Sequence, residues 1–324
     1  MAELQPQEIF LLERYSSLEY LMQVREAWKV FVQFTEQCLE KHMQHLPPNQ
    51  RRKPLPDQAD IVWSGTVLPN FRAILDGLNR SVIMRSHDDP DVFIGLCGGV
   101  MSANKGESEF SHDWMNEVEQ EQYYELLSQA LMLAQMAKAT AARTWSEGTL
   151  TRLYTEEFFG PLALPVRIPA YELDKNIMVG PHDPVTTTGI YLPDLPSTSA
   201  QLLHPRSSRD RAGPEGVLRA WQGKTKDEDG YWEENEWVPA TWTLVRRIEG
   251  QFIEVPPQGF YPAETQPTAT RADANQPCPQ SGYWYTPAKA HSRAYFNKAD
   301  LMPDYPASSY GATIWYWDMN QGGH

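Results

Sequence analysis

Apolar residues recur every three or four positions through the first half of the chain, which is the spacing of amphipathic helices. This pattern covers residues from about Gln7 to His45, Pro69 to Leu78, Glu117 to Trp145 and Leu150 to Phe159. Pro47 and Pro48 end the first stretch, which is either one long helix or two. We expect these helices to pack as an antiparallel bundle over residues 1–160.

Beyond Phe159 the pattern changes to short apolar runs separated by Pro, Gly, Ser and Asp, which is typical of strands and turns. The strand candidates are Val166–Ile168, Gly189–Leu192, Val217–Trp221, Thr241–Ile248, Phe252–Val255, Tyr283–Tyr285 and Ala312–Trp317. The polar stretch from Pro262 to Pro279 reads as a surface loop. The predicted fold class is α+β, with a helical domain at 1–160 followed by a small, loop-rich antiparallel β domain at 161–324.

Two stretches of the second half resemble each other, at about 186–221 and 279–317. Each begins with a small residue and a glycine, Thr188-Gly189 and Ser281-Gly282, followed by an aromatic run that closes on proline. Trp221 follows Gly189 by nearly the same interval as Trp315 follows Gly282. We therefore consider an internal duplication, with two unrelated hairpins as the alternative.

Composition limits the partners of the chain. Its 324 residues carry a formal net charge of −14, which repels nucleic acid and anionic lipid and attracts basic proteins. The three separated cysteines indicate a reducing compartment. The N-terminus lacks a secretory signal, and no stretch approaches the roughly 20 apolar residues of a membrane span. We expect a cytoplasmic protein with no membrane and no nucleic-acid partner.

The acidic residues are most concentrated between residues 227 and 236. Asp227, Asp229, Glu233, Glu234 and Glu236 are interleaved there with the aromatic residues Tyr231, Trp232 and Trp237. One interpretation is a solvated loop. The other is a docking patch, where charge accelerates encounter with a basic protein and aromatic rings supply the buried contact.

Sequence motifs of catalysis are missing from the chain: it has no nucleophile elbow, no phosphate-binding loop, no dinucleotide fingerprint and no zinc-protease helix. We therefore expect no enzyme, no catalytic residue, no cofactor and no metal. The residues weighed against this expectation are Cys38, His42 and His45 for zinc, Cys97 as a nucleophile, and His87, Asp88, Asp91 and His112 as convergent ligands or catalytic groups.

The tryptophans near the C-terminus are further candidates for binding. Trp284, Trp315 and Trp317 lie in the second copy of the repeat. Strand alternation turns half of such residues inward as core, and any that remain outside form an exposed aromatic patch. Arg293, between the two motifs of this copy, either pairs with an acidic group of a partner or caps the local sheet.

The same C-terminal residues carry a family resemblance. The run Gln276–Pro287, followed by Arg293–Phe296, Leu301–Pro303 and Tyr310–Trp315, resembles the C-terminal signature of immunity protein families 71 and 72 of bacterial polymorphic toxin systems. That resemblance implies an antitoxin of a type VI or contact-dependent secretion effector, with a helical N-terminal part and an aromatic C-terminal part. It supplies no inhibitory residue to place on this chain.

Charge and resemblance together predict stoichiometric inhibition of a cognate toxin effector domain, itself basic. The expected contact surface is the acidic run with Trp232, together with Trp284, Arg293, Trp315 and Trp317. Two alternatives stay open: a hydrolase that detoxifies the toxin's product, and a glycan- or peptide-binding module that uses the tryptophans as stacking platforms.

Overall fold

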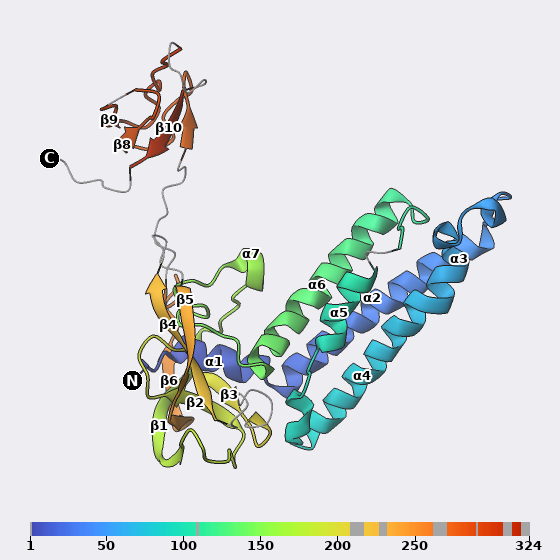
Figure 1. Ribbon diagram of the computed structural model, residues 1–324, viewed down its shortest axis with the longest axis horizontal. Coiled ribbons are helices and arrows are strands. Elements are labelled where there is room, and N and C mark those ends of the chain that lie inside the picture. Colours follow the sequence, from blue (N-terminus) through green and yellow to red (C-terminus); the bar gives the residue numbers. More distant parts are fainter. Residues whose placement is uncertain are drawn as a thin grey trace. The chain divides into compact units, whose positions relative to one another are not determined.

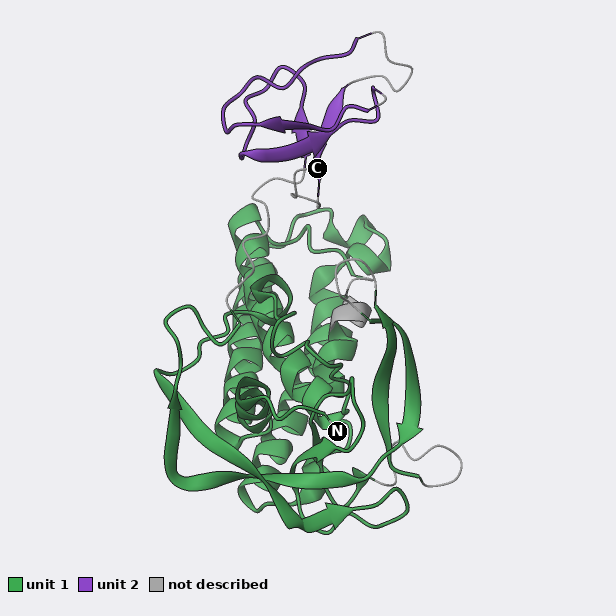
Figure 2. Cartoon of the chain, turned by 90° about the vertical axis from the view of Figure 1, so that its left-hand side faces the viewer, with its two compact units in different colours: residues 1–261 green, residues 262–324 purple. Residues whose placement is uncertain are grey.

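The chain forms two compact units, residues 1–261 and 262–324, which Figure 2 distinguishes by colour. The structure is a computed structural model that describes residues 2–107, 110–207, 217–226, 232–261, 271–289, 291–306 and 313–318. Within these ranges, no helix combines the length and the apolar composition needed to cross a bilayer.

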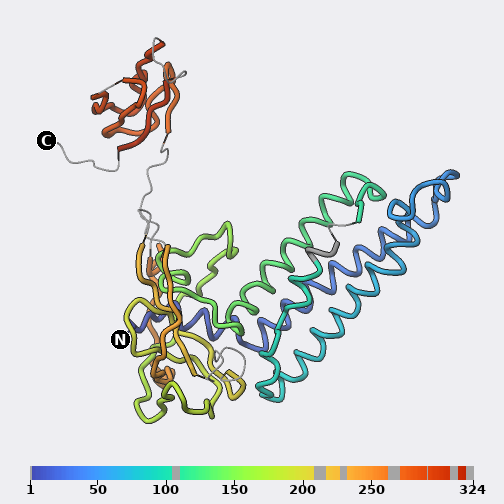
Figure 3. Tube along the Cα trace, viewed as in Figure 1, coloured from blue at the N-terminus to red at the C-terminus, as the bar shows by residue number. Residues whose placement is uncertain are grey.

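Helices make up the first part of unit 1. They are α1 (Pro6–Tyr15), α2 (Leu18–Gln44), α3 (Ala59–Val62), α4 (Leu68–Ser86), α5 (Gly98–Glu107), α6 (Glu117–Ala141) and α7 (Glu156–Phe159), with 3-10 turns η1 (Gln50–Arg52), η2 (Leu55–Asp57) and η4 (Pro90–Phe93) and a π turn η3 (Trp63–Val67). Helices α2, α4, α5 and α6 run alongside one another, as Figures 1 and 3 show. The helical bundle expected at the start of the chain is therefore present.

Capping side chains explain where the long helices begin. Ser17 separates α1 from α2, and its hydroxyl accepts the backbone N–H of Tyr20 at 3.1 Å, so the first apolar stretch is two helices. Asn116 and Glu119 form a reciprocal capping box at the start of α6. The helix expected over Leu150–Phe159 is wrong over most of its length, because turns follow Gly148 and only the short α7 is helical.

Strands follow from residue 167 onward. Unit 1 holds β1 (Arg167–Val179), β2 (Gly189–Pro193), β3 (Gln201–Leu203), β4 (Arg219–Lys226), β5 (Trp232–Pro239) and β6 (Trp242–Glu254); unit 2 holds β7 (Arg271–Asp273), β8 (Gly282–Tyr285), β9 (Ala294–Phe296) and β10 (Ile314–Trp317). All pairings are antiparallel, in sheets ordered β1-β6-β2-β3 and β7-β10-β8-β9 and in the separate hairpin β4-β5. The predicted α+β class is confirmed.

The central part of the unit 1 sheet, at β2, β3 and the start of β6, is buried on both faces, whereas much of β1 and β6 farther along is exposed. Ile190, Leu192 and Leu202 turn toward the helices and join the large core, where α1 packs on β1 and β2 and α6 packs on β3. Tyr191 and Trp242 turn the other way, into a smaller core that the base of the β4-β5 hairpin closes. Helices and sheet share a core, so the compact units part near residue 261 and not at the expected 160/161 boundary, where only the secondary structure changes.

A buried carboxylate joins α1 to the loop before β3. The two oxygens of Glu8 accept the Ser199 hydroxyl at 2.6 Å and the Ala200 backbone N–H at 3.1 Å. Burial raises the pKa of Glu8 to about 7, although both hydrogen bonds oppose that rise. Glu8 thus joins α1 to the loop before β3, and its burial makes the charged form of the carboxylate less favourable than it is in water.

The two four-stranded sheets have the same topology. In each, the first strand pairs with the last, the last with the second and the second with the third. Their registers also agree: Val179 opposes Trp242 and Ala272 opposes Trp315, while Gly189 opposes Leu203 and Gly282 opposes Phe296. Each residue from β1 to β3 therefore corresponds to the residue 93 positions later.

The equivalent residues also share their environment. The small core of unit 1 contains Val179, Val185, Tyr191, Leu203 and Trp242, and the core of unit 2 contains or is flanked by Ala272, Cys278, Trp284, Phe296 and Trp315 at the corresponding positions. At the start of β2, a Cβ on Gly189 would lie 2.6 Å from a terminal methyl carbon of Leu244, so a larger residue there would require that side chain to shift.

One hydrogen bond recurs in both copies. The Tyr191 hydroxyl donates to the Thr187 carbonyl at 2.9 Å, and the Trp284 Nε1 donates to the Gln280 carbonyl at 3.3 Å. Donor and acceptor are four residues apart in each case and occupy equivalent positions.

The duplication differs from the expected one in its last element. Trp315 corresponds to Trp242 and not to Trp221, because β4 pairs with β5 alone. The interval from Leu203 to Trp242 is 39 positions and that from Phe296 to Trp315 is 19, so the first copy holds 20 more residues, which accommodate the β4-β5 hairpin. Of the expected loop at 262–279, residues 262–270 lie outside the described part, and Arg271–Asp273 form β7.

Glu8→Gln is expected to remove a pH dependence of stability. Between pH 4.5 and about 7 the folded chain keeps a proton that the unfolded chain loses, so the unfolding free energy of the native protein falls as pH rises. Glutamine carries no charge; its oxygen can accept the Ala200 N–H and its NH2 group can donate to the Ser199 hydroxyl. Urea unfolding should show the variant more stable by about 2–3 kcal/mol at pH 8 and nearly equal at pH 4, whereas Glu121→Gln, an exposed control, changes neither.

Trp242→Ala is expected to destabilise unit 1 by about 3–5 kcal/mol, because it empties the position that Trp315 fills in unit 2. Trp221→Ala removes a half-buried ring and should cost about 1–2 kcal/mol. Denaturant titrations of the full chain followed by tryptophan fluorescence measure both. Equal losses would contradict the assignment of Trp242 as the counterpart of Trp315.

Candidate partner-binding site

The β4-β5 hairpin is the element that the first copy of the repeat has and the second lacks. Its strands pair from Arg219 opposite Pro239 to Lys226 opposite Trp232, with register shifts near Thr225. At its base Ala220 is buried in the small core, and toward the turn the side chains become exposed. The described part of the acidic run, from Trp232 onward, is therefore a strand and not the expected loop, with Glu233 at the register shift between the pairs Thr225–Glu234 and Lys226–Trp232.

Trp232 anchors the hairpin to the segment after α6. Its Nε1 donates to the Glu147 carbonyl oxygen at 3.3 Å, and the Lys226 Nζ lies 4.2 Å from the ring centroid. The ring occupies space that only glycine leaves, since a Cβ on Gly223 would lie 2.1 Å from it. The Glu147 carboxylate pairs with Arg152 at 2.8 Å and with Lys226 at 3.6 Å. Trp232 thus has a structural role at this place, in contrast to its expected role as a contact residue.

The acidic residues of β5 are on the surface. Glu233 and Glu234 are exposed, and neither forms an ion pair within the described ranges. Glu236 pairs with the Lys224 Nζ at 3.3 Å, with both side chains largely in solvent. Asp227 and Asp229 lie outside the described residues. The described part of the acidic run therefore offers Glu233 and Glu234 to a partner, with Glu236 already partly neutralised.

A pair of tryptophans sits on the hairpin beside these acids. Trp221 opposes Trp237, and their ring centroids are 4.8 Å apart at an interplanar angle of 50°. Both are half-buried. Trp237 was expected among the aromatic residues of the docking patch, whereas Trp221 was not, although two tryptophans on either side of an acidic segment are the sequence signal of a cross-strand aromatic pair.

The expected tryptophan surface of unit 2 is wrong for two of its three members. Trp284 and Trp315 are 0% and 1% exposed and form the core of this unit. Trp317 is half-buried, with its ring edge-on to Trp284 at 5.2 Å. Their burial also counts against the tryptophans as stacking platforms for a glycan.

Arg293 is held by its own unit. Its Nε donates to the Asp318 carboxylate, and its guanidinium carbon lies 3.9 Å from the centroid of the Tyr283 ring. Of the two roles expected for Arg293, the structure supports capping of the local sheet. The acidic hairpin belongs to unit 1 and these residues to unit 2.

The residues weighed for catalysis or metal binding have separate environments. Asp91 pairs with Arg206, Asp88 pairs with Arg85, and the His112 ring packs against Trp63 and Tyr123. Across the described ranges, no three histidine, cysteine or acidic residues gather as a metal site would require.

The thiols are buried and poor nucleophiles. Burial raises the pKa of Cys97 to about 12 and that of Cys38 to about 11, and it also raises the pKa of Cys278. Because the thiolate is the reactive form, these shifts oppose a nucleophilic role for Cys97.

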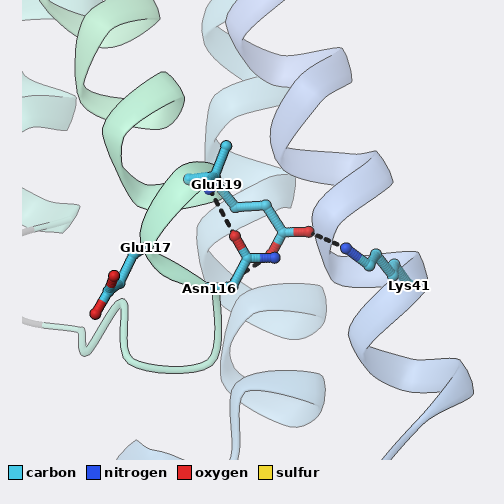
Figure 4. Close-up of a pocket in the computed structure, with 5 residues that line it drawn as sticks. Lys41, Asn116, Glu117 and Glu119 are labelled. Carbon is cyan, nitrogen blue, oxygen red and sulfur yellow. Dashed lines mark hydrogen bonds and ion pairs between the residues drawn. The ribbon is translucent and has the colours of Figure 1, made fainter.

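An open hollow lies where α6 begins, against the end of α2. Lys41, Asn116, Glu117, Val118 and Glu119 line it, and Figure 4 shows Glu119 between Lys41 and Asn116. The side chains of Lys41, Asn116 and Glu119 are engaged in the capping box and in the Lys41–Glu119 ion pair. The hollow is thus a consequence of how α6 is capped.

No protein family, no curated protein and no solved structure with which the chain was compared matches it.

Proposed function

We propose that this protein is an immunity protein that binds a basic toxin effector domain of a polymorphic toxin or type VI secretion system and inhibits it stoichiometrically in the bacterial cytoplasm. The C-terminal resemblance to immunity protein families 71 and 72 supports this class. The observation that carries the proposal is the exposed acidic edge at Glu233 and Glu234, on a hairpin inserted into an otherwise repeated sheet.

The charge distribution favours the hairpin's unit for this contact. Residues 262–324 contain four basic and five acidic residues, so nearly all of the net charge of −14 belongs to residues 1–261. A field of that sign steers a basic domain toward unit 1. Trp221 and Trp237 beside the acids supply the aromatic area that interface centres use.

Inhibition by occupancy needs no catalytic group in this chain. A rigid, charged hairpin that enters the cationic groove of a toxin excludes the toxin's substrate, and the stability of the complex sets the protection. Co-expression with the toxin domain encoded beside this chain tests the class. Growth rescue with co-purification supports a binding inhibitor, whereas rescue without a complex supports enzymatic detoxification.

Glu233→Lys with Glu234→Lys is expected to weaken the toxin complex by about 10- to 100-fold, mainly through a slower association rate. The matched control is Glu121→Lys with Glu125→Lys, which changes the net charge equally on the exposed face of α6. Surface plasmon resonance at low and moderate salt separates a local from a global effect. Equal losses in both variants, or no loss in either, would remove the hairpin from the interface.

A further inference from the structure

Four tyrosines share the outer face of the unit 2 sheet. Tyr283 opposes Tyr295 and Tyr285 opposes Tyr316, and directly opposed residues of antiparallel strands point to the same side. They alternate along β8 and β10 with the buried Trp284 and Trp315, so they lie on the face away from the core. We call this set the tyrosine face.

The tyrosine face is open to solvent. Tyr285 is 43% and Tyr295 is 55% exposed, while Tyr283 and Tyr316 are half-buried. The rings pack in pairs, with centroids 5.3 Å apart for Tyr283 and Tyr295 and 5.9 Å for Tyr285 and Tyr316. A contiguous aromatic surface of this kind on a small unit marks an interaction site.

The counterpart of this face in unit 1 is covered. By the shift of 93 positions, Tyr283, Tyr285 and Tyr295 correspond to Ile190, Leu192 and Leu202, which are 4%, 2% and 2% exposed.

Helices α1 and α6 cover that counterpart, since they pack on β2 and β3. In unit 1, the sheet face that corresponds to the tyrosine face is thus covered by helices.

The change of residue type matches the change of exposure. Aliphatic side chains at the three positions in unit 1 suit permanent burial. Tyrosine suits a face that is alternately wet and covered, because its ring contributes contact area and its hydroxyl stays hydrated when the face is open.

The shape of the tyrosine face favours a helix over a sugar ring. The Tyr283 and Tyr295 planes meet at 80° and those of Tyr285 and Tyr316 at 32°, so the four rings do not form one flat stacking platform. The side chains of an amphipathic helix fit between such rings.

In unit 1, the helix α1 that covers the equivalent sheet face also brings acidic side chains to it. Glu13 of α1 pairs with Arg247 at 2.8 Å, and Glu8 reaches the backbone N–H of Ala200. The residue that corresponds to Ala200 is Arg293, beside Tyr283, and its guanidinium also pairs with Asp318. Arg271 opposes Tyr316; its side chain is 60% exposed and lies 3.5 Å from the Asp273 carboxylate.

We propose that the tyrosine face binds an amphipathic helix of a partner protein, with an apolar stripe like that of α1 flanked by carboxylates. This proposal is independent of the proposed toxin inhibition. The near-neutral charge of unit 2 makes contact between apolar surfaces, and not long-range attraction, the main source of affinity.

The test uses the full-length protein and a labelled peptide of residues 3–17, which contains α1. Fluorescence anisotropy is expected to show binding with a Kd of about 10–100 µM, changing less than about threefold with added salt. Tyr285→Ser with Tyr295→Ser should raise the Kd at least about tenfold. Both side chains are exposed, so near-UV circular dichroism should show unit 2 still folded.

Matched controls distinguish binding at the tyrosine face from nonspecific hydrophobic binding. Phe158→Ser with Phe252→Ser removes two exposed aromatic rings of unit 1 and should leave the Kd unchanged. A peptide with Ile9→Asp and Leu12→Asp should not bind.

The proposal is overturned by no binding up to about 1 mM or by binding that the tyrosine variant leaves intact. Tyrosine-dependent self-association in sedimentation would assign the face to a second copy, and tyrosine-dependent binding of oligosaccharides would assign it to glycans; either also overturns it. No toxin enters these measurements, so their failure leaves the proposed inhibition untouched.

Discussion

Burial of the strands at the centre of the sheet on both faces is the constraint on which unit 1 depends. Because side chains alternate along a strand, β2 sends Ile190 and Leu192 into the helical core and Tyr191 into the smaller one. The bundle therefore packs on one face of the sheet, and the base of the hairpin packs on the other. Glu8 lies at the junction between α1 and the sheet, where its carboxylate is cut off from water.

Local signals were sufficient for the long helices, but not for α5, for the turns after Gly148 or for most of the strands. Helical periodicity and caps such as Asn116 are properties of short segments, so the bundle could be predicted. β1 was predicted only at its start, because Glu172, Lys175 and Asn176 lie along it in place of an apolar run. β5 was interpreted as a loop because its glutamates have low strand propensity, and pairing with β4 outweighs that preference.

The repeat shows how a sequence period can mislead. Trp221 follows Gly189 by nearly the interval that separates Trp315 from Gly282, yet only the strand registers identify Trp242 as the counterpart. The candidate sites had the same difficulty. The sequence Tyr283-Trp284-Tyr285 implies that one residue type faces inward, and three-dimensional packing decides that it is tryptophan. Charge could be read from the sequence, but exposure could not.

Tyr191 in one copy and Trp284 in the other each donate the equivalent hydrogen bond, and this bond limits which residues the repeated sheet accepts at that position. Both side chains carry a hydrogen-bond donor on a large ring, and phenylalanine at either position would leave the carbonyl four residues earlier without that donor. The two copies accordingly keep a spacing and share few residues: a proline, a glycine five positions on, and an aromatic donor two positions beyond it. Relatives of this module in other proteins would be recognised by that spacing and by strand order, at sequence identities too low for alignment.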